Sequence, residues 1–177
     1  MFENGGSFGL AFFANIVNSA NARVVSAIDV HSPACIDLIK NLHVIQQHEV
    51  FVEKFRNKTG FVLVAPDKGS LPKIEKLAFC VDEFGVLTFD KERELSTGKI
   101  LRHYPKDWRD DYLGKDFYIV DDICDGGATY VSIGKQLKIL SPNSKVVLMV
   151  THGFFTKGLD VFNDIIDEVY TKEGKIK

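Results

Sequence analysis

The chain has few cysteines, little excess charge and no long apolar run, and each shortage excludes a class of protein. Its 177 residues include only three cysteines, Cys35, Cys80 and Cys124. This odd, widely spaced set fits reduced thiols better than a disulfide framework or a zinc site. The net charge of −2 gives no general attraction to nucleic acid or to an anionic membrane. No stretch is long and apolar enough to span a bilayer. We therefore expect a cytoplasmic protein that binds neither nucleic acid nor membrane.

The chain also lacks targeting and repeat signals. Glu3 and Asn4 stand where a secretory signal peptide needs a basic segment. There is no tandem repeat and no low-complexity segment. The apolar content of 45% and charged content of 26% are ordinary for a globular protein. The length is sufficient for one domain with a substantial core.

Strand-like and helix-like segments alternate along the chain, which predicts an α/β fold with a mostly parallel sheet and helices on both faces. Apolar runs predict strands over residues 23–30, 61–65, 86–89, 117–120, 145–150 and 168–170. Helical spacing predicts helices over residues 2–18, 44–56, 71–79, 130–140 and 157–166. Residues 95–116 show little periodicity and are expected to form a long loop, either a binding lid or a solvated surface loop.

One stretch, residues 117–129, combines an apolar run with acids and small residues. The run ends in Asp121 and Asp122, at the edge where open α/β sheets bind ligands. The small residues from Gly126 to Ala128 let the backbone approach a ligand, and the next helix start would complete an anion site. Acids beside a phosphate cradle predict a sugar phosphate, with the acids taking hydroxyls or hydrated Mg²⁺ and the loop taking the phosphate.

Other strand ends carry polar residues too. Asp29 and His31 follow the predicted strand at residues 23–30, where a ligand role and a structural hydrogen-bonding role are equally supported. Asp67 to Gly69 follow the next strand with an acid, a base and a glycine.

Cys124 is better interpreted as a small residue in a tight turn than as a nucleophile, because no histidine is nearby in the sequence to activate it.

Together these stretches resemble the ribose-phosphate diphosphokinase family, also called phosphoribosyl-diphosphate (PRPP) synthetase, which has the type I phosphoribosyltransferase fold. Val120 to Thr129 resembles the PRPP signature of that fold. The order and spacing of four further segments look like the synthetase: Ser26–Ser32, Ala65–Gly69, Asp90–Arg93 and Val150–Phe155. The resemblance implies a phosphoribosyltransferase-like fold. It also implies an enzyme that uses ATP, ribose 5-phosphate and Mg²⁺ to make PRPP for nucleotide and NAD synthesis.

The resemblance implies roles for the matching residues at the central stretch and the loop after the strand at 61–65. Asp121 and Asp122 would meet the ribose hydroxyls and Mg²⁺. The 5-phosphate would be held by Asp125, Gly126, Gly127, Ala128 and Thr129. The diphosphate loop would consist of Asp67, Lys68 and Gly69. His31 and Asp67 would position the metal or the ATP phosphates.

Lys91 and Arg93 would be the catalytic cations. The resemblance places them where they stabilise negative charge on the transferring diphosphate, a task done mainly by positioned cations. They are two positions apart in an extended segment, so both side chains are expected on the same side. Without the resemblance, the run from Asp90 to Glu94 would be interpreted as a solvated charged surface.

The chain departs from the family in length. Family members have two similar α/β halves, and this chain resembles the end of the first half followed by a complete second half. We expect residues 1–43 to be a remnant of the first half, with one helix and one strand, and residues 44–177 to form a phosphoribosyltransferase-like domain. Ser70 stands where the family usually has a second glycine. An open strand edge at residues 24–28 beside an apolar helix predicts a homo-oligomer.

Two other functions remain open on the sequence. One is a phosphoribosyltransferase that uses PRPP to modify a base. The other is a non-catalytic regulatory module that keeps the sugar-phosphate pocket without the ATP site.

Overall fold

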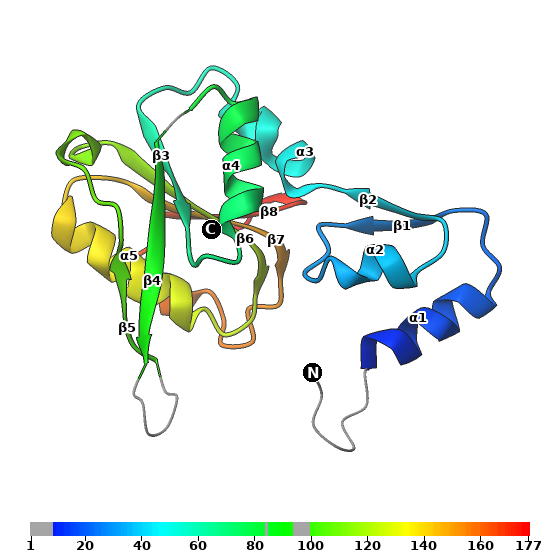
Figure 1. The fold of residues 1–177 in the computed structure, drawn as a ribbon. Helices are drawn as coiled ribbons and strands as arrows, with labels where there is room; N and C mark the ends of the chain where they lie inside the picture. Colours follow the sequence, from blue (N-terminus) through cyan, green and yellow to red (C-terminus); the bar gives the residue numbers. More distant parts are fainter. Residues whose placement is uncertain (1–8, 84, 94–99) are drawn as a thin grey trace. The chain divides into compact units, whose positions relative to one another are not determined.

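The computed structural model describes residues 9–83, 85–93 and 100–177 (Figure 1). The chain divides into two compact units, Met1–Gln46 and Gln47–Lys177. None of the helices in the described ranges is both long enough and apolar enough to cross a membrane.

Within residues 9–46, the first unit contains two helices and two parallel strands: α1 (Gly9–Ser19), β1 (Val25–Ile28), α2 (Ala34–Leu38) and β2 (Leu42–Ile45). The Asn18 side chain links its parts, because it donates to the Leu38 carbonyl at 2.9 Å and accepts from the Lys40 amide at 2.8 Å. The strand predicted at residues 23–30 is confirmed with narrower bounds. The helix predicted from residue 44 was wrong at its start, because Val44 and Ile45 pair with β1 instead.

The second unit is built on a sheet of seven strands within the described residues, in the order β5-β4-β3-β6-β7-β8-β9. The strands are β3 (Phe61–Ala65), β4 (Val86–Arg93), β5 (Ile100–Pro105), β6 (Asp116–Cys124), β7 (Val146–Gly153), β8 (Glu168–Thr171) and β9 (Gly174–Lys175). Five of these strands run parallel to one another, namely β3, β4, β6, β7 and β8. The edge strands β5 and β9 run antiparallel to their neighbours β4 and β8. The helices are α3 (Gln47–Phe51), α4 (Leu71–Cys80) and α5 (Ala128–Leu140).

Helices cover both faces of this sheet. Val62 and Val64 of β3 pack in one core cluster with side chains of α5. Leu63 and Ala65 pack in a second cluster with side chains of α3 and α4. Successive strand side chains point to opposite faces, so α5 covers one face and α4 the other. All five residues of β3 are buried, as expected for a strand covered on both sides. The predicted α/β class with a mostly parallel sheet is confirmed.

Three further predicted elements were wrong in part. The loop predicted over residues 95–116 contains β5, whose strand structure comes from its pairing with β4 rather than from its own weak alternation. The helix predicted over residues 157–166 is a set of turns around one 3₁₀ turn, Asp160–Phe162, because Gly158 and Asp164 both have positive φ angles, 73° and 61°. The strand predicted to end at residue 120 continues to Cys124, because it keeps pairing with β7.

Candidate functional site

The strands β3 and β6 lie side by side where the strand order of the sheet reverses. From β3 the chain crosses through α4 to β4 on one side, and from β6 it crosses through α5 to β7 on the other. Open α/β sheets bind ligands outside the carboxyl ends of the strands at this point. Val64 pairs with Ile119, so the loop after β3 lies beside the last residues of β6. The site is therefore expected between these two strand ends.

The loop after β3 closes on the Asp67 carboxylate. Asp67 Oδ1 accepts hydrogen bonds from the amides of Gly69 and Ser70, at 2.9 and 3.1 Å. Its other oxygen, Oδ2, lies 2.9 Å from the Lys91 ammonium. Burial alone would raise the pKa of Asp67, but the Lys91 ammonium and the two amides outweigh burial and hold that pKa below its usual value. Lys68 lies 3.2 Å from Asp90 Oδ2. The structure thus brings together the predicted loop and one predicted catalytic cation.

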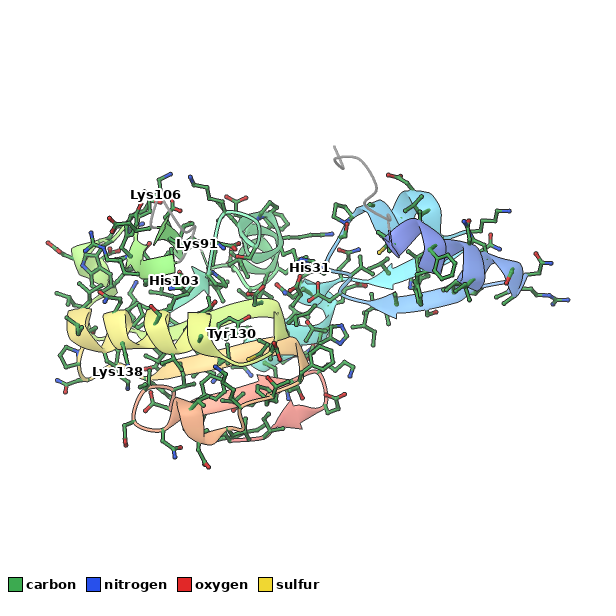
Figure 2. All side chains as sticks on the ribbon, turned by 90° about the horizontal axis from the view of Figure 1, so that it is seen from below. His31, Lys91, His103, Lys106, Tyr130 and Lys138 are labelled. Carbon is green, nitrogen blue, oxygen red and sulfur yellow. The ribbon has the colours of Figure 1, made fainter. Side chains whose placement is uncertain are left out.

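The two adjacent acids of β6 are contacted from opposite faces of the sheet. Asp122 Oδ2 lies 2.9 Å from the ammonium of Lys73, which is in the first turn of α4. Asp121 Oδ2 lies 2.8 Å from the hydroxyl of Tyr130. Tyr130, which Figure 2 labels, is in the first turn of α5. Sequence reasoning missed Lys73 and Tyr130. The available signal was their place just after the two strand-end loops, where a first helical turn lies over the strand ends.

Asp121 is held in a way that favours its protonated form. Burial, together with the charges of Asp122 and Asp67, raises the pKa of Asp121 to about 6. The Tyr130 hydroxyl, with one proton, lies 2.6 Å from the Ile123 carbonyl as well as 2.8 Å from Asp121. When Tyr130 donates to that carbonyl, a protonated Asp121 donates to the tyrosine oxygen and both hydrogen bonds are made. Burial and the Asp121 carboxylate raise the pKa of Tyr130 above its usual value.

The phosphate-loop residues predicted from the sequence line one open cavity of about 420 Å³. The lining residues are Ile123, Asp125, Gly126, Gly127, Ala128, Thr129, Tyr130, Thr156 and Lys157. Gly127 has a φ of +76°, and a Cβ there would lie 2.7 Å from the Phe162 ring, so glycine is required at this position. The amides at the start of α5 face an anion at such a loop. Thr156 and Lys157, which follow β7, were not predicted as part of the site.

Two predicted site residues are not placed with the others. The pairing of β4 with β5 shifts register between Glu92 and Arg93, which interrupts the alternation expected for Lys91 and Arg93. The Arg93 side chain lies outside the described part of the chain. His31 belongs to the first unit, so its part in a metal site with Asp67 stays a prediction.

Known proteins with similar sequences agree on one family. No family model matches the chain. The ribose-phosphate pyrophosphokinase of Thermococcus kodakarensis is 32% identical over 145 residues, which cover 80% of this chain and 49% of that protein. The one from Mycoplasmopsis pulmonis is 29% identical over 163 residues, covering 88% of this chain and 49% of that protein. The chain belongs to the ribose-phosphate pyrophosphokinase family. It spans about half the length of the curated relatives it matches.

Solved structures agree on the fold of this family member. The phosphoribosylpyrophosphate synthetase of Mycobacterium smegmatis superimposes with a TM-score of 0.79 at 17% identity, over 95% of this chain and 54% of that chain. Adenine phosphoribosyltransferase of Saccharomyces cerevisiae superimposes with a TM-score of 0.53 at 17% identity, over 80% of this chain and 81% of that chain. The predicted phosphoribosyltransferase-like fold is confirmed.

The acids of this pyrophosphokinase-family chain fit a hydrated magnesium ion rather than a protein-caged one. Among the residues that the structure describes, no group of three or more His, Cys, Asp or Glu side chains is placed to hold a metal. Mg²⁺ keeps several waters and is usually bound through one or two carboxylates together with substrate phosphates. Asp67 and Asp122 supply such carboxylates, each now facing a lysine at 2.9 Å.

Cys124 is not available as a nucleophile. Its side chain is buried, and burial with the nearby charges of Asp121 and Asp125 raises the pKa of its thiol to about 12. The thiolate, which is the reactive form, is therefore absent at neutral pH. This agrees with the interpretation of Cys124 as a small structural residue.

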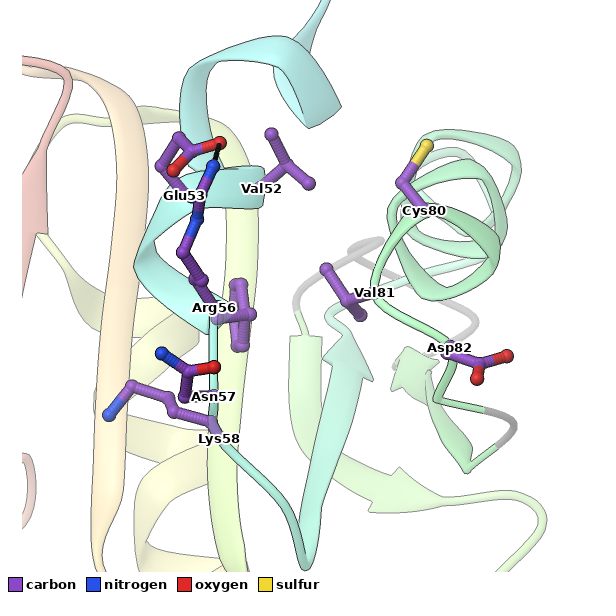
Figure 3. Close-up of a pocket in the computed structure, with 9 residues that line it drawn as sticks. Val52, Glu53, Arg56, Asn57, Lys58, Cys80, Val81 and Asp82 are labelled. Carbon is purple, nitrogen blue, oxygen red and sulfur yellow. Dashed lines mark hydrogen bonds and ion pairs between the residues drawn. The ribbon is translucent and has the colours of Figure 1, made fainter.

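A second hollow, of about 340 Å³, lies near the amino ends of β3 and β4 (Figure 3). It is bounded by residues that precede β3 and β4, among them Arg56, Lys58 and Asp82. The Arg56 guanidinium forms an ion pair with Glu53 Oε1 at 2.7 Å, and Figure 3 marks this contact with a dashed line. The hollow is thus remote from the strand ends that carry the acids, and it has mixed charge.

Proposed function

We propose that this chain is a ribose-phosphate diphosphokinase-like enzyme, which transfers the diphosphate of ATP to the C1 hydroxyl of ribose 5-phosphate. The product, PRPP, would serve nucleotide and NAD synthesis. The observation that supports this best is the pair of loops at the switch point of the sheet. The loop after β3 carries Asp67, whose Oδ2 lies 2.9 Å from the ammonium of Lys91 in β4. The loop after β6 borders an open cavity at the start of α5. Membership of the ribose-phosphate pyrophosphokinase family supports the same reaction.

In this proposal the sugar phosphate lies across the end of β6. Its 5-phosphate occupies the cavity bordered by Asp125 to Thr129, where the amides of the loop and of α5 meet its oxygens. The ribose hydroxyls lie against Asp122 and Asp121. Because β3 is the neighbour of β6, the C1 hydroxyl then faces the Asp67 loop.

The diphosphate of ATP lies at the Asp67 loop. The C1 hydroxyl oxygen forms a bond to the β-phosphorus and releases its proton to solvent, the bond from that phosphorus to the bridging oxygen of the α-phosphate breaks, and AMP leaves with the electron pair of that bond. Asp67 or Asp122 would hold Mg²⁺, which would supply positive charge to offset that of the diphosphate oxygens. Lys91 is already at the loop, and it can exchange the Asp67 carboxylate for phosphate oxygens that gain charge in the transition state.

Replacing Lys91 tests its catalytic role. Lys91→Ala removes a positioned cation, and it should lower the rate of AMP release from ATP and ribose 5-phosphate by roughly 10²–10³-fold, as for loss of one preorganised donor. Lys135→Ala, at an exposed position of α5, is the matched control and should keep the full rate. An unchanged rate in Lys91→Ala would remove Lys91 from the mechanism.

The cavity at the start of α5 supports a second candidate, a non-catalytic module that binds the sugar phosphate alone, because the phosphate-loop residues line this cavity without any residue of the Asp67 loop. Titration calorimetry separates the two. Binding of ribose 5-phosphate without measurable binding of ATP would favour the module and exclude the synthetase reaction. A phosphoribosyltransferase activity is tested in parallel by PRPP consumption with a panel of bases.

A further inference from the structure

The segment that follows β7 is tied to the phosphate loop. The Thr156 hydroxyl donates to Asp125 Oδ1 at 2.6 Å, and the Thr156 amide lies 3.2 Å from the Asp125 carbonyl. Just before this contact in both segments, the Phe154 amide donates to the Cys124 carbonyl at 2.8 Å. These bonds hold the segment at the rim of the cavity, and the next residue along it is Lys157.

The backbone of this segment is held in an unfavourable conformation. Phe155 has a φ of 47°, in the left-handed region that a bulky side chain rarely adopts. Its ring packs edge-on to Phe162 at 6.2 Å and fills the space where a Cβ on Gly153 would lie, only 1.9 Å away. Such conformations persist only where the surroundings fix them, and they cluster at ligand sites. The ring contacts of Phe155 thus hold the turn that leads to Lys157.

Lys157 reaches over the loop itself. Its Cδ and Cε atoms lie 3.4 Å from the position that a Cβ on Gly126 would take, so the lysine stem rests on this glycine. The residue lines the same cavity as Thr129.

Lys157 differs from the other lysines of the site because its ammonium does not pair with a carboxylate of the described residues. Lys68, Lys73 and Lys91 each meet a carboxylate, at 2.9 to 3.2 Å. For Lys157 there is no ion pair or hydrogen bond with any of the residues that the structure describes. The cavity also contains the Asp125 carboxylate, which would repel a dianionic phosphate. A cation at the rim offsets that repulsion.

We propose that Lys157 binds the phosphate group of the sugar phosphate and makes the cavity select phosphorylated over unphosphorylated sugars. This assignment rests on the proposed function, since it gives that ligand one more contact. The loop amides position the phosphate, and the lysine supplies the full positive charge that the loop lacks. A charge-assisted contact of this kind is stronger than one between neutral groups.

The test compares Lys157→Met with Lys135→Met. Methionine keeps an unbranched stem over Gly126 and removes the charge, and Lys135 is an exposed lysine on α5 outside the cavity lining. Titration calorimetry measures ribose 5-phosphate, ribose and inorganic phosphate, with thermal unfolding as a check of folding. For ribose 5-phosphate we expect Lys157→Met to raise the Kd about tenfold, in line with loss of one charged hydrogen bond. Ribose binding and the Lys135→Met variant should be unchanged, and Lys157→Arg should restore most of the affinity.

The outcomes separate this assignment from the proposed function. Equal ribose 5-phosphate affinity in the parent and Lys157→Met would overturn the role of Lys157 and leave the proposed function standing. If the parent binds inorganic phosphate through Lys157 but not ribose 5-phosphate, the proposed substrate falls and the phosphate contact stands. If the parent binds neither ligand, both are overturned.

Discussion

Asp121 occupies its position at a cost to the folded state. Its carboxylate is largely enclosed between Tyr130 and the end of β6, and its pKa is raised to about 6 by burial and by neighbouring carboxylates. At neutral pH the group is therefore ionised in surroundings that favour the neutral acid. A group kept ionised against its environment is typical of a functional site, which agrees with a role in holding ribose hydroxyls.

We expect Asp121→Asn to stabilise the protein while weakening its binding of ribose 5-phosphate. The folded pKa of about 6 lies above the ordinary 3.8, so the folded state binds more protons between these values. The contribution of Asp121 to stability is then greatest below its ordinary pKa and is lost as pH rises through 6. The substitution removes this loss, which is on the order of 1–3 kcal/mol at pH 7.5.

Urea unfolding of both proteins from pH 4 to pH 8, in metal-free buffer, measures this difference. The gain in unfolding free energy should grow as pH rises toward 7. Asp110→Asn, at an exposed position, is the control and should show no such trend. A gain that is independent of pH would show that ionisation of Asp121 is not its cause.

The acids could be predicted from the sequence, but their partners could not. An apolar run followed by Asp121 and Asp122 is a local pattern that a linear sequence displays directly. Lys73 and Tyr130 reach these acids only because α4 and α5 cover opposite faces of the sheet. That arrangement depends on packing between distant segments, which no local pattern contains.

Among the helices and strands, too, local sequence patterns predicted some elements, while others depend on contacts with distant segments. The strands β3, β6 and β7 were predictable because strands covered on both faces are continuous apolar runs. β5 was not, because an edge strand with charged residues resembles a solvated loop and becomes a strand through its partner β4. The false helix at residues 157–166 had helical apolar spacing, but positive φ angles at Gly158 and Asp164 break it. The turn that replaces it carries Lys157 into the site.

Gly127 and Gly114 offer a matched test of the phosphate loop. Both have a φ of +76°, but a Cβ would meet the Phe162 ring at 2.7 Å only at Gly127, whereas Gly114 faces open space. Alanine at Gly114 should cost about 1–2 kcal/mol of unfolding free energy for the left-handed backbone. Alanine at Gly127 should cost a further 1–3 kcal/mol or so from overpacking.

Urea denaturation of the two variants measures these costs. Gly127→Ala should also lose ribose 5-phosphate binding, because the start of α5 must shift, while Gly114→Ala should keep it. Equal destabilisation by the two substitutions would mean that Phe162 moves aside freely and does not shape the loop.

The whole chain leaves apolar surface exposed in its first unit. Phe12 and Ile16 of α1 are 69% and 55% exposed, and Val24 beside β1 is 64% exposed. Residues 9–46 of this unit form a two-stranded sheet, and such a sheet has little stability of its own. Exposed apolar groups of this kind usually mark an interaction surface. We propose that a second copy of the chain covers them, in keeping with the predicted homo-oligomer.

Light scattering coupled to size-exclusion chromatography tests this proposal. The mass should exceed the 19.9 kDa of one chain and rise with concentration. Phe12→Ser combined with Ile16→Ser should return it toward one chain. Ile139→Ser, which removes an equally exposed apolar side chain from α5, should not. A constant mass of one chain at all concentrations would contradict self-association.

The continuation of β6 through Asp121 and Asp122 has a consequence for how the site opens. These acids lie in a strand whose pairing with β7 extends to Cys124 and Gly153. Central strands of a sheet exchange their amide hydrogens mainly through global unfolding, whereas loops exchange through local fluctuations. The backbone that carries Asp121 and Asp122 is therefore expected to be protected to the same extent as the core, whereas the Asp67 loop is expected to open alone. The β6 side of the candidate site should thus persist for as long as the protein is folded, with local motion confined to the Asp67 loop.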